Sequence, residues 1–335
     1  MDNLTHTLIG LFLSRAGLRN WTPRATPILL LAANAPDIDV LSGLAGPLPY
    51  LHYHRHLTHS LAAMPVLAAA VVLLVRIAGR SPLSWFKAFC AALIGLASHL
   101  LLDWTNPYGI RLLLPFSARW LRLDTTNVID LWIWAALLVG VLAPLLARLV
   151  GSEITSGALR PRHHGRSAAI FALLFVLFYD CGRGVLHARA EAMLESRIYQ
   201  DLPPLRVAAL PGAANPLRWR GVVETREFFA IADVDLTRPF DPSRALVYQK
   251  PDPGPALDAA RRTPAFQQFL AFSQFPLWRV LPVAEPENGS QVDCMDLRFG
   301  TPAAPAFMAS ALVDARQRVV STSFQFGPGP IAKAD

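Results

Sequence analysis

The chain has 335 residues, of which 53% are hydrophobic and only 16% charged, and its mean hydropathy is positive at +0.34. An ordinary soluble domain carries about 25% charged residues, so this composition favours an integral membrane protein. The net charge of +7 is concentrated in short connections between apolar runs, which favours membrane topology over nucleic-acid binding, and no direct nucleic-acid binding is expected.

Two short apolar segments come first along the chain. The pattern predicts one helix from Leu4 to Ala16, and a second apolar run, Ile28 to Ala35, ends at Pro36. A membrane span needs about 20 residues, so each segment could be half-buried or re-entrant. The residues before Leu8 lack the basic start of a cleavable signal peptide, so the first apolar stretch is expected to stay in the mature protein.

Four longer apolar segments are candidate spans: Ser60 to Ala78, Trp85 to Leu102, Val128 to Val150 and Ser167 to Leu186. With alternating crossings, the basic residues near 15–24, 76–87 and 148–166 fall on one side, which the positive-inside rule assigns to the cytoplasm. Arg111, Arg119 and Arg122 fall on the opposite side and weaken this orientation. The topology predicts a multi-pass membrane protein whose polar candidate site lies on the extracytoplasmic side.

The composition changes after about residue 200. Pro203, Pro204, Pro211 and Pro216 indicate a linker, and alternating or β-branched runs then predict strands, with one amphipathic helix from Thr263 to Ser273. The predicted strands are Arg218 to Glu224, Phe228 to Leu236, Arg244 to Tyr248, Gln291 to Phe299, and a hairpin of Phe307 to Val313 with Val319 to Phe326. We therefore predict an α-helical polytopic membrane bundle over residues 1–195 and a soluble extracytoplasmic α+β domain over residues 196–335.

His99 and Asp103 are four residues apart at the end of a candidate span. This spacing places both side chains on one helix face, where they could bind one ion. Ionisable groups near lipid are costly, and imidazole with carboxylate suits zinc and related divalent ions. A hydrogen-bonded pair that only orients the helix end is the equally weighted alternative.

Other candidate ligands precede the first long span. Four histidines within eight residues, His52, His54, His56 and His59, form either part of a metal site or a solvated interfacial cluster. In the sequence Pro36-Asp-Ile-Asp39, Asp37 is the expected ligand, while Asp39 could instead cap a helix. His6 alone is a weak candidate. These groups all fall at the outer ends of the predicted helices, which is the main argument for one shared site.

Further polar residues have several possible roles. Asp124 and Asp130 could cap helices, orient a ligand histidine or act as a general base. Arg55 and Arg111 could bind an anionic substrate, and Arg111 could instead face lipid headgroups. The chain has no GxSxG, P-loop, dinucleotide or CxxC motif, so the sequence does not suggest nucleophilic catalysis, a thiolate metal site or a disulfide framework.

Several motifs in order resemble the YdjM-like family of LexA-binding, inner-membrane-associated, metal-dependent hydrolases. The matching segments are Met1-Asp-Asn-Leu-Thr-His6, Ala33-Asn-Ala-Pro-Asp-Ile-Asp39, His54-Arg-His-Leu-Thr-His-Ser60, Ser98-His-Leu-Leu-Leu-Asp103, and Asn106-Pro-Tyr-Gly109 continuing to Leu114-Pro-Phe116. The resemblance covers about residues 1–150 and implies a location in the bacterial inner membrane. The family is also distantly similar to zinc-dependent phospholipase C and related zinc nucleases. These similarities imply a metal cluster at His99 and Asp103, with His6, Asp37, His54 and His59 as further ligands; His56 stands where the family has a small residue.

The combined expectation is a membrane-bound metal-dependent hydrolase that acts on a phosphoester such as a phospholipid or another lipid-linked phosphoester. Two or three divalent ions, with zinc as the expected metal, would activate water. Asp39 or Asp130 would orient a ligand or act as base, and Arg55 and Arg111 would hold the substrate's charge. The alternative is a non-catalytic membrane protein with a structural metal site and a partner-binding C-terminal domain. A transporter is disfavoured because the ionisable groups lie at one face and not at the bilayer midplane.

Overall fold

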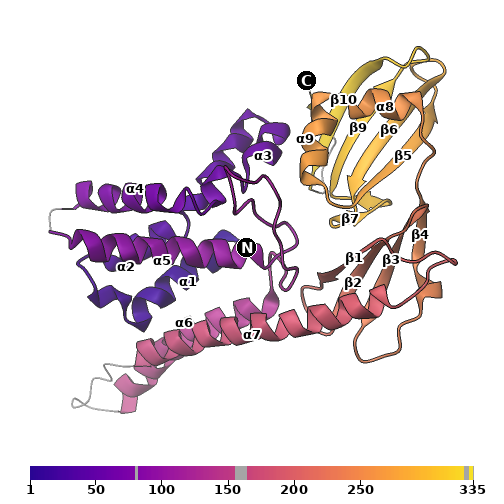
Figure 1. Ribbon diagram of the computed structural model, residues 1–335. Coiled ribbons are helices and arrows are strands. Elements are labelled where there is room, and N and C mark those ends of the chain that lie inside the picture. Colours follow the sequence, from indigo (N-terminus) through magenta and orange to yellow (C-terminus); the bar gives the residue numbers. More distant parts are fainter. Residues whose placement is uncertain (80–81, 155–163, 328–331, 335) are drawn as a thin grey trace. The chain divides into compact units, whose positions relative to one another are not determined.

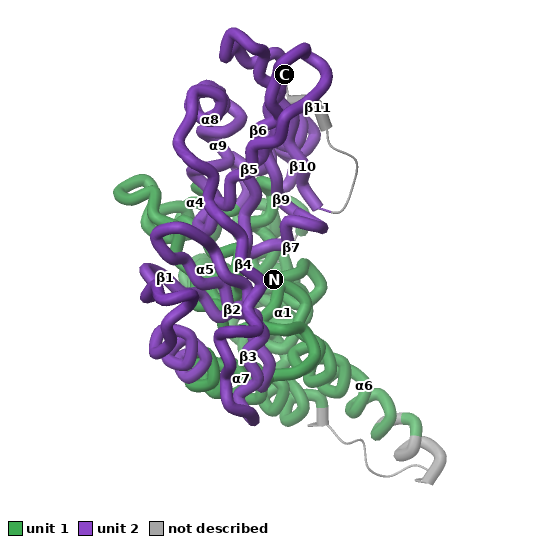
Figure 2. The backbone as a smooth tube through the Cα atoms, turned by 90° about the vertical axis from the view of Figure 1, so that its right-hand side faces the viewer, with its two compact units in different colours: residues 1–39, 55–187, 211–216 green, residues 40–54, 188–210, 217–335 purple. Residues whose placement is uncertain are grey.

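The computed structural model describes residues 1–79, 82–154, 164–327 and 332–334 (Figure 1). The contacts between residues divide the chain into two compact units (Figure 2). The helical unit comprises Met1–Asp39, Arg55–His187 and Pro211–Pro216, and the sheet unit comprises Val40–His54, Ala188–Leu210 and Leu217–Asp335. The sequence predicted a domain boundary between residues 195 and 196. The sheet unit also includes residues 40–54, a segment from the N-terminal third of the chain.

The helical unit contains each apolar segment that the sequence predicts to be helical. Its helices are α1 (Asn3–Ala16), η1 (Leu18–Asn20), α2 (Ala25–Ala32), η3 (Leu57–His59), α4 (Met64–Ile77) and α5 (Trp85–Trp104), followed by α6 (Leu131–Ile154) and most of α7 (His164–Glu195). A 3-10 segment, η2 (Ala35–Ala45), follows α2 and continues into the sheet unit. The helix expected from Ser60 starts only at Met64, because Ser60 closes a turn in which its hydroxyl donates to Leu57 and accepts from the Ala63 amide.

Small residues allow α1, α2 and α5 to pack closely. A Cβ on Gly10 would lie 2.9 Å from the Leu29 carbonyl oxygen, and one on Gly95 would lie 2.9 Å from the Ala32 Cβ. Glycine at such positions lets helix backbones approach one another. This contact is continuous with an apolar core that includes Leu29, Ala32 and Leu96, so α2 and α5 are held in a fixed register.

Within the part of the chain that the structure describes, two helices are long and apolar enough to cross a membrane: α5, and Gly165–Glu195 of α7. Two bent pairs bring the number of candidate spans in the described residues to at most four: Ala25–Ala32 with Ala35–Ala45, bent by 44°, and Pro47–His59 with Met64–Ile77, bent by 86°. The described apolar part of α6, Leu131–Ala147, is shorter. The protein is thus helical in its N-terminal region with two to four candidate spans. Part of the basic 148–166 segment used for the predicted orientation lies outside the described residues.

The sheet unit contains two antiparallel sheets. The first has the order β1-β2-β3-β4, and the second has the order β11-β10-β9-β6-β5. The first sheet is formed by β1 (Arg206–Pro211), β2 (Arg218–Glu224), β3 (Phe228–Asp235) and β4 (Leu246–Gln249). The second is formed by β5 (Pro276–Val283), β6 (Gly289–Asp296), β9 (Phe307–Val313), β10 (Val319–Phe326) and β11 (Ala332–Ala334). The sheet unit also contains a separate two-stranded ribbon of β7 (Gly300–Thr301) and β8 (Ala304–Pro305), and a 3-10 turn, η4 (Pro242–Arg244).

Helices α8 (Pro255–Arg261) and α9 (Pro264–Phe272) pack on the second sheet through contacts with β6, β9 and β10 (Figure 1). The predicted hairpin is confirmed, with Phe307 opposite Phe326 and Val313 opposite Val319. The predicted linker is wrong in part, because β1 lies between its prolines. Pro211 ends this strand, and the apolar residues Ala208 and Leu210 are buried in a core shared with Val222 and Met295.

The sheet unit also holds the short helix α3 (Pro47–Tyr53), which contacts α9, β10 and β11. The ring of Tyr50 on α3 meets the ring of Phe326 on β10 edge to face, with centroids 4.8 Å apart. This aromatic contact anchors α3 to the sheet and explains why residues 40–54 group with the C-terminal part of the chain.

Candidate metal centre

Four side chains from three separate segments converge in the helical unit. Asp37 comes from η2, His59 from η3, and His99 and Asp103 from consecutive turns of α5. One ligand atom from each lies within 4.8 Å of the other three. His59, His99 and Asp103 are fully buried, and the side chain of Asp37 is only 10% exposed. The i,i+4 geometry predicted for His99 and Asp103 is confirmed, since their Nε2 and Oδ2 atoms are 3.4 Å apart.

The separations of these atoms match the edges of a coordination tetrahedron. Four ligands at about 2.0–2.1 Å from a tetrahedral ion lie about 3.3–3.4 Å from one another. His59 Nε2 is 3.4 Å from Asp37 Oδ1, 3.3 Å from Asp103 Oδ2 and 3.1 Å from His99 Nε2. His99 Nε2 is 3.5 Å from Asp37 Oδ1. The four residues are therefore spaced to hold one small divalent ion.

Both imidazole rings are oriented with Nε2 toward this centre. His99 Nδ1 lies 2.7 Å from the Ala33 carbonyl oxygen, and His59 Nδ1 lies 3.1 Å from Asp39 Oδ2. When Nδ1 carries the proton to these acceptors, each Nε2 presents a lone pair. Two facing nitrogens 3.1 Å apart need either a shared proton or a metal ion between them, and a metal ion would take the place of that proton. The close approach of α2 and α5 at Gly95 brings Ala33 within reach of His99, one turn further along α5.

The balance of charge at the centre also favours a cation. The carboxylates of Asp37, Asp39 and Asp103 are 10%, 5% and 0% exposed. Among the described residues, the guanidinium of Arg55 and the amino group of Met1 contact Asp103 as positive groups. Against the effect of burial, hydrogen bonds to Asp103, Asp37 and Asp39 raise the pKa of His59 to about 10, so a metal ion would displace a proton from this ring. Buried carboxylates without full compensation are costly. Asp103 Oδ2, one of the four converging ligand atoms, is buried and makes no hydrogen bond among the described residues, as expected for an atom that binds a metal.

The second oxygen of Asp103 faces His6, which lies on α1. Asp2 starts this helix by accepting the amides of Leu4 and Thr5 at 3.1 and 3.0 Å. His6 Nε2 is 3.3 Å from Asp103 Oδ1, and its ring stacks on that of His99 with centroids 3.8 Å apart. Burial lowers the pKa of His6 to about 3, so the ring is neutral near pH 7 and able to bind a metal.

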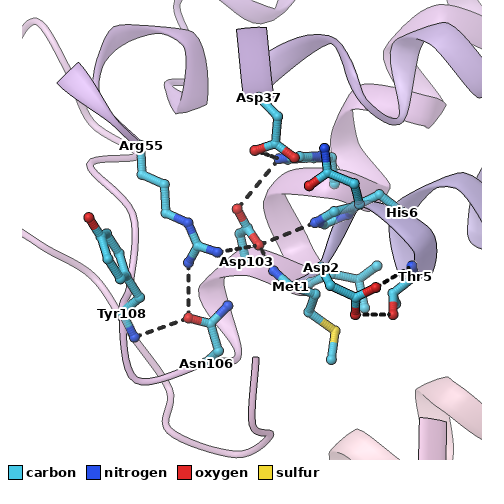
Figure 3. A network of polar contacts seen from close by, with 12 residues as sticks. Met1, Asp2, Thr5, His6, Asp37, Arg55, Asp103, Asn106 and Tyr108 are labelled. Carbon is cyan, nitrogen blue, oxygen red and sulfur yellow. Dashed lines mark hydrogen bonds and ion pairs between the residues drawn. The ribbon is translucent and has the colours of Figure 1, made fainter. Parts of the chain in front are cut away.

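Arg55 lies on the other side of Asp103 (Figure 3). Its guanidinium is 3.1 Å from Asp103 Oδ1 and donates to Asn106 Oδ1 at 2.9 Å. Asn106 Oδ1 also accepts the Tyr108 amide at 3.0 Å, and the Arg55 guanidinium lies 4.8 Å from the centre of the Tyr108 ring. Asp103 is thus fixed by α5, Arg55 and the turn that follows α5.

Of the ten residues predicted for the site, these contacts bring together seven: His6, Asp37, Asp39, Arg55, His59, His99 and Asp103. Asp39 lies behind His59, where it also accepts the Arg55 amide and the Thr58 hydroxyl, each at 2.8 Å. His54 ends α3 in the sheet unit, and its ring stacks on Tyr50 with centroids 4.6 Å apart. It is not among the described residues that converge on one ion.

Asp130 and Arg111 have other partners. Asp130 caps α6, accepting the amides of Trp132 and Ile133 at 3.0 and 3.3 Å, and it also accepts the Tyr179 hydroxyl. This is the helix-cap role among its predicted alternatives. The Arg111 guanidinium lies 4.9 Å from the centre of the Trp120 ring.

Two supporting groups did not emerge from the sequence reasoning. Asn106 was named only within the family segment Asn106-Pro-Tyr-Gly109 and was given no role, although its place in that motif could have indicated one. The role of the Ala33 carbonyl could not be identified from the sequence, because every residue type has a backbone carbonyl acceptor.

Comparison with known proteins agrees with the motifs of the N-terminal region. Residues 1–190 match the family described as YdjM inner membrane protein. The chain belongs to this family. The resemblance inferred from the motifs is thereby confirmed, and membership together with the apolar helices indicates association with a membrane.

The C-terminal part has its own match. Residues 255–327 match the YfhP C-terminal alpha/beta plait domain, in agreement with helices α8 and α9 on an antiparallel sheet. The uncharacterized protein YfhP of Bacillus subtilis (strain 168) is 26% identical over 152 residues, which cover 42% of this chain and 45% of that protein. The chain thus matches less than half of that relative's length. No solved structure matches the chain.

Proposed function

We propose that this protein is a membrane-bound, metal-dependent hydrolase of phosphoesters. The observation that carries the proposal is the set of five separations of 3.1–3.5 Å among Asp37, His59, His99 and Asp103. These four residues would hold one divalent ion, with zinc as the expected metal. Asp103 Oδ1 and His6 offer ligands for a second ion. A metal in such a site lowers the pKa of bound water toward neutrality and polarises a phosphoryl oxygen.

The protein's own residues would position this chemistry. Asp39 holds His59 through Nδ1 and so keeps its Nε2 directed at the centre. Arg55 fixes Asp103 and supplies positive charge next to it, where a phosphoryl group would need neutralisation. Arg111 remains a candidate for substrate binding.

The proposed substrate is a phospholipid or another lipid-linked phosphoester. Asp103 lies in the last turn of α5, one of the two helices long and apolar enough to cross a membrane. The end of such a helix lies near the lipid headgroups. We place the centre and the sheet unit on the extracytoplasmic side, on the basis of the basic segment at 76–87. A reporter fused after Asp335 should then be active outside the cytoplasm, and activity only inside would contradict this orientation.

A non-catalytic role is the second candidate, and one observation favours it. Structural zinc sites are closed by four protein ligands, and Asp37, His59, His99 and Asp103 supply four with almost complete burial. A single tightly held ion that does not exchange would favour this structural role. Two ions per chain, or one that exchanges readily, would favour catalysis.

The test of function uses the full chain in lipid nanodiscs with bis(4-nitrophenyl) phosphate and a short-chain phosphatidylcholine. Hydrolysis should disappear with a chelator, return with zinc and be lost in His99→Gln. His187→Gln, a substitution of a half-buried histidine on α7, is the matched control and should keep activity. Hydrolysis that resists chelation, or that is blocked by a serine-directed reagent, would contradict the proposed chemistry.

A further inference from the structure

Residues 40–54 form a loop that leaves and re-enters the helical unit at the metal centre. The two residues that flank it, Asp39 and Arg55, belong to the helical unit, whereas the loop itself belongs to the sheet unit. The Arg55 amide donates to Asp39 Oδ2 at 2.8 Å, which closes the base of the loop. Both flanking residues contact the centre, Asp39 through His59 and Arg55 through Asp103.

A cavity of about 410 Å³ lies within the sheet unit beside this loop. Its walls come from α3, α9 and β10, and include Pro49, His52, Tyr53, Pro264, Gln268 and Thr322. Small-molecule sites in proteins commonly measure about 300–1,000 Å³ and combine apolar walls with a few polar groups. The cavity fits this description.

The lining of the cavity defines the chemistry of a ligand. None of the residues that line it is Lys, Arg, Asp or Glu, so a charged ligand would find no permanent counter-charge. Gln268 and Thr322 contribute polar side chains to the lining, and a ligand hydroxyl could hydrogen-bond to such groups. Apolar and aromatic walls suit an aliphatic body.

We infer that this cavity binds a small uncharged amphiphile with a hydroxyl donor, and that its occupancy is transmitted to the metal centre through α3. An occupant would contact α3 on one side and α9 on the other, and would hold α3 in place. His54 ends α3, and the next residue is Arg55. Any restraint on α3 therefore acts on the backbone of Arg55, and by linkage the state of the centre also affects ligand affinity.

The test uses the full chain in nanodiscs and 1-octanoylglycerol with a photoreactive diazirine in its acyl chain. We expect saturable labelling of residues 47–53 and 264–268 that unlabelled octanoylglycerol reduces and octanoate does not. Gln268→Leu should lower labelling at least about fivefold, equivalent to about 1 kcal/mol. Gln267→Leu changes an exposed glutamine of the same helix and should have no effect. Equal labelling in both variants, or equal competition by octanoate in the wild type, would overturn the site.

Hydrogen exchange of the unlabelled protein tests transmission, and it depends neither on bound metal nor on hydrolysis. Octanoylglycerol should slow amide exchange at least about threefold in residues 47–53 and also in residues 55–60, which include the Arg55 amide held by Asp39. Failure of the proposed hydrolase activity would leave this result unaffected. Protection restricted to 47–53 and 264–272 would contradict transmission to the centre.

Discussion

Replacing His99 by glutamine should weaken metal binding severely without unfolding the protein. Glutamine is similar in size and can keep a hydrogen bond to the Ala33 carbonyl, but it lacks the imidazole Nε2 that lies 3.1–3.5 Å from the other three ligand atoms. Structural zinc sites contribute roughly 10–16 kcal/mol through four ligands, or about 3–4 kcal/mol for each. The expected loss is therefore about 10²–10³-fold in affinity.

The assay is competition for zinc between a chromophoric chelator and the protein purified in nanodiscs. His187→Gln is the matched control and should bind zinc like the wild type. Circular dichroism of both variants shows whether the helices remain. Equal zinc affinity in the wild type and in folded His99→Gln would refute the assignment of His99 to the centre.

Four further substitutions separate the roles of neighbouring residues. Asp39→Asn should lower zinc affinity about 10–100-fold, because the carboxylate orients His59, and the chelator titration measures this. His54→Gln should leave zinc affinity unchanged, since its ring stacks on Tyr50; a large loss would restore the sequence-based ligand assignment. Asp130→Ala should reduce the free energy of unfolding by about 0.5–2 kcal/mol through loss of the α6 cap, with unchanged metal content. Burial lowers the pKa of His6 to about 3, so between about pH 6.5 and 3 the unfolded state binds one more proton than the folded state. As the pH falls through that window, the melting temperature of the chelator-treated wild type should decrease, and that of His6→Gln should decrease less.

The sequence predicted the local elements of the site well. Hydrophobic periodicity identified α1 and α5, and the spacing of His99 and Asp103 implied a shared helix face, which the structure confirms. These features depend on residues close together in sequence. The apolar helices were identified for the same reason, and the described residues contain two to four candidate membrane spans among them.

The sequence could not resolve features that depend on long-range packing. His54 and His59 are five residues apart and looked equivalent, but Tyr50 and Phe326 anchor α3 in the sheet unit and carry His54 with it. The strand β1 was missed because Pro211 and its neighbours suggested a linker, while burial against the core decided otherwise. Arg55 looked like a substrate-binding group, and only the fold shows that it already contacts Asp103.

The metal centre itself can be tested most directly by X-ray absorption at the zinc edge of the full chain loaded with zinc. The structure predicts nitrogen and oxygen ligands at about 2.0–2.1 Å, with outer-shell scattering from two imidazoles, as given by His59, His99, Asp37 and Asp103. At least one ion should be bound per chain, and the two-imidazole signal should fall to one in His99→Gln. A spectrum with sulfur ligands, or one that is unchanged in His99→Gln, would contradict the existence of this centre.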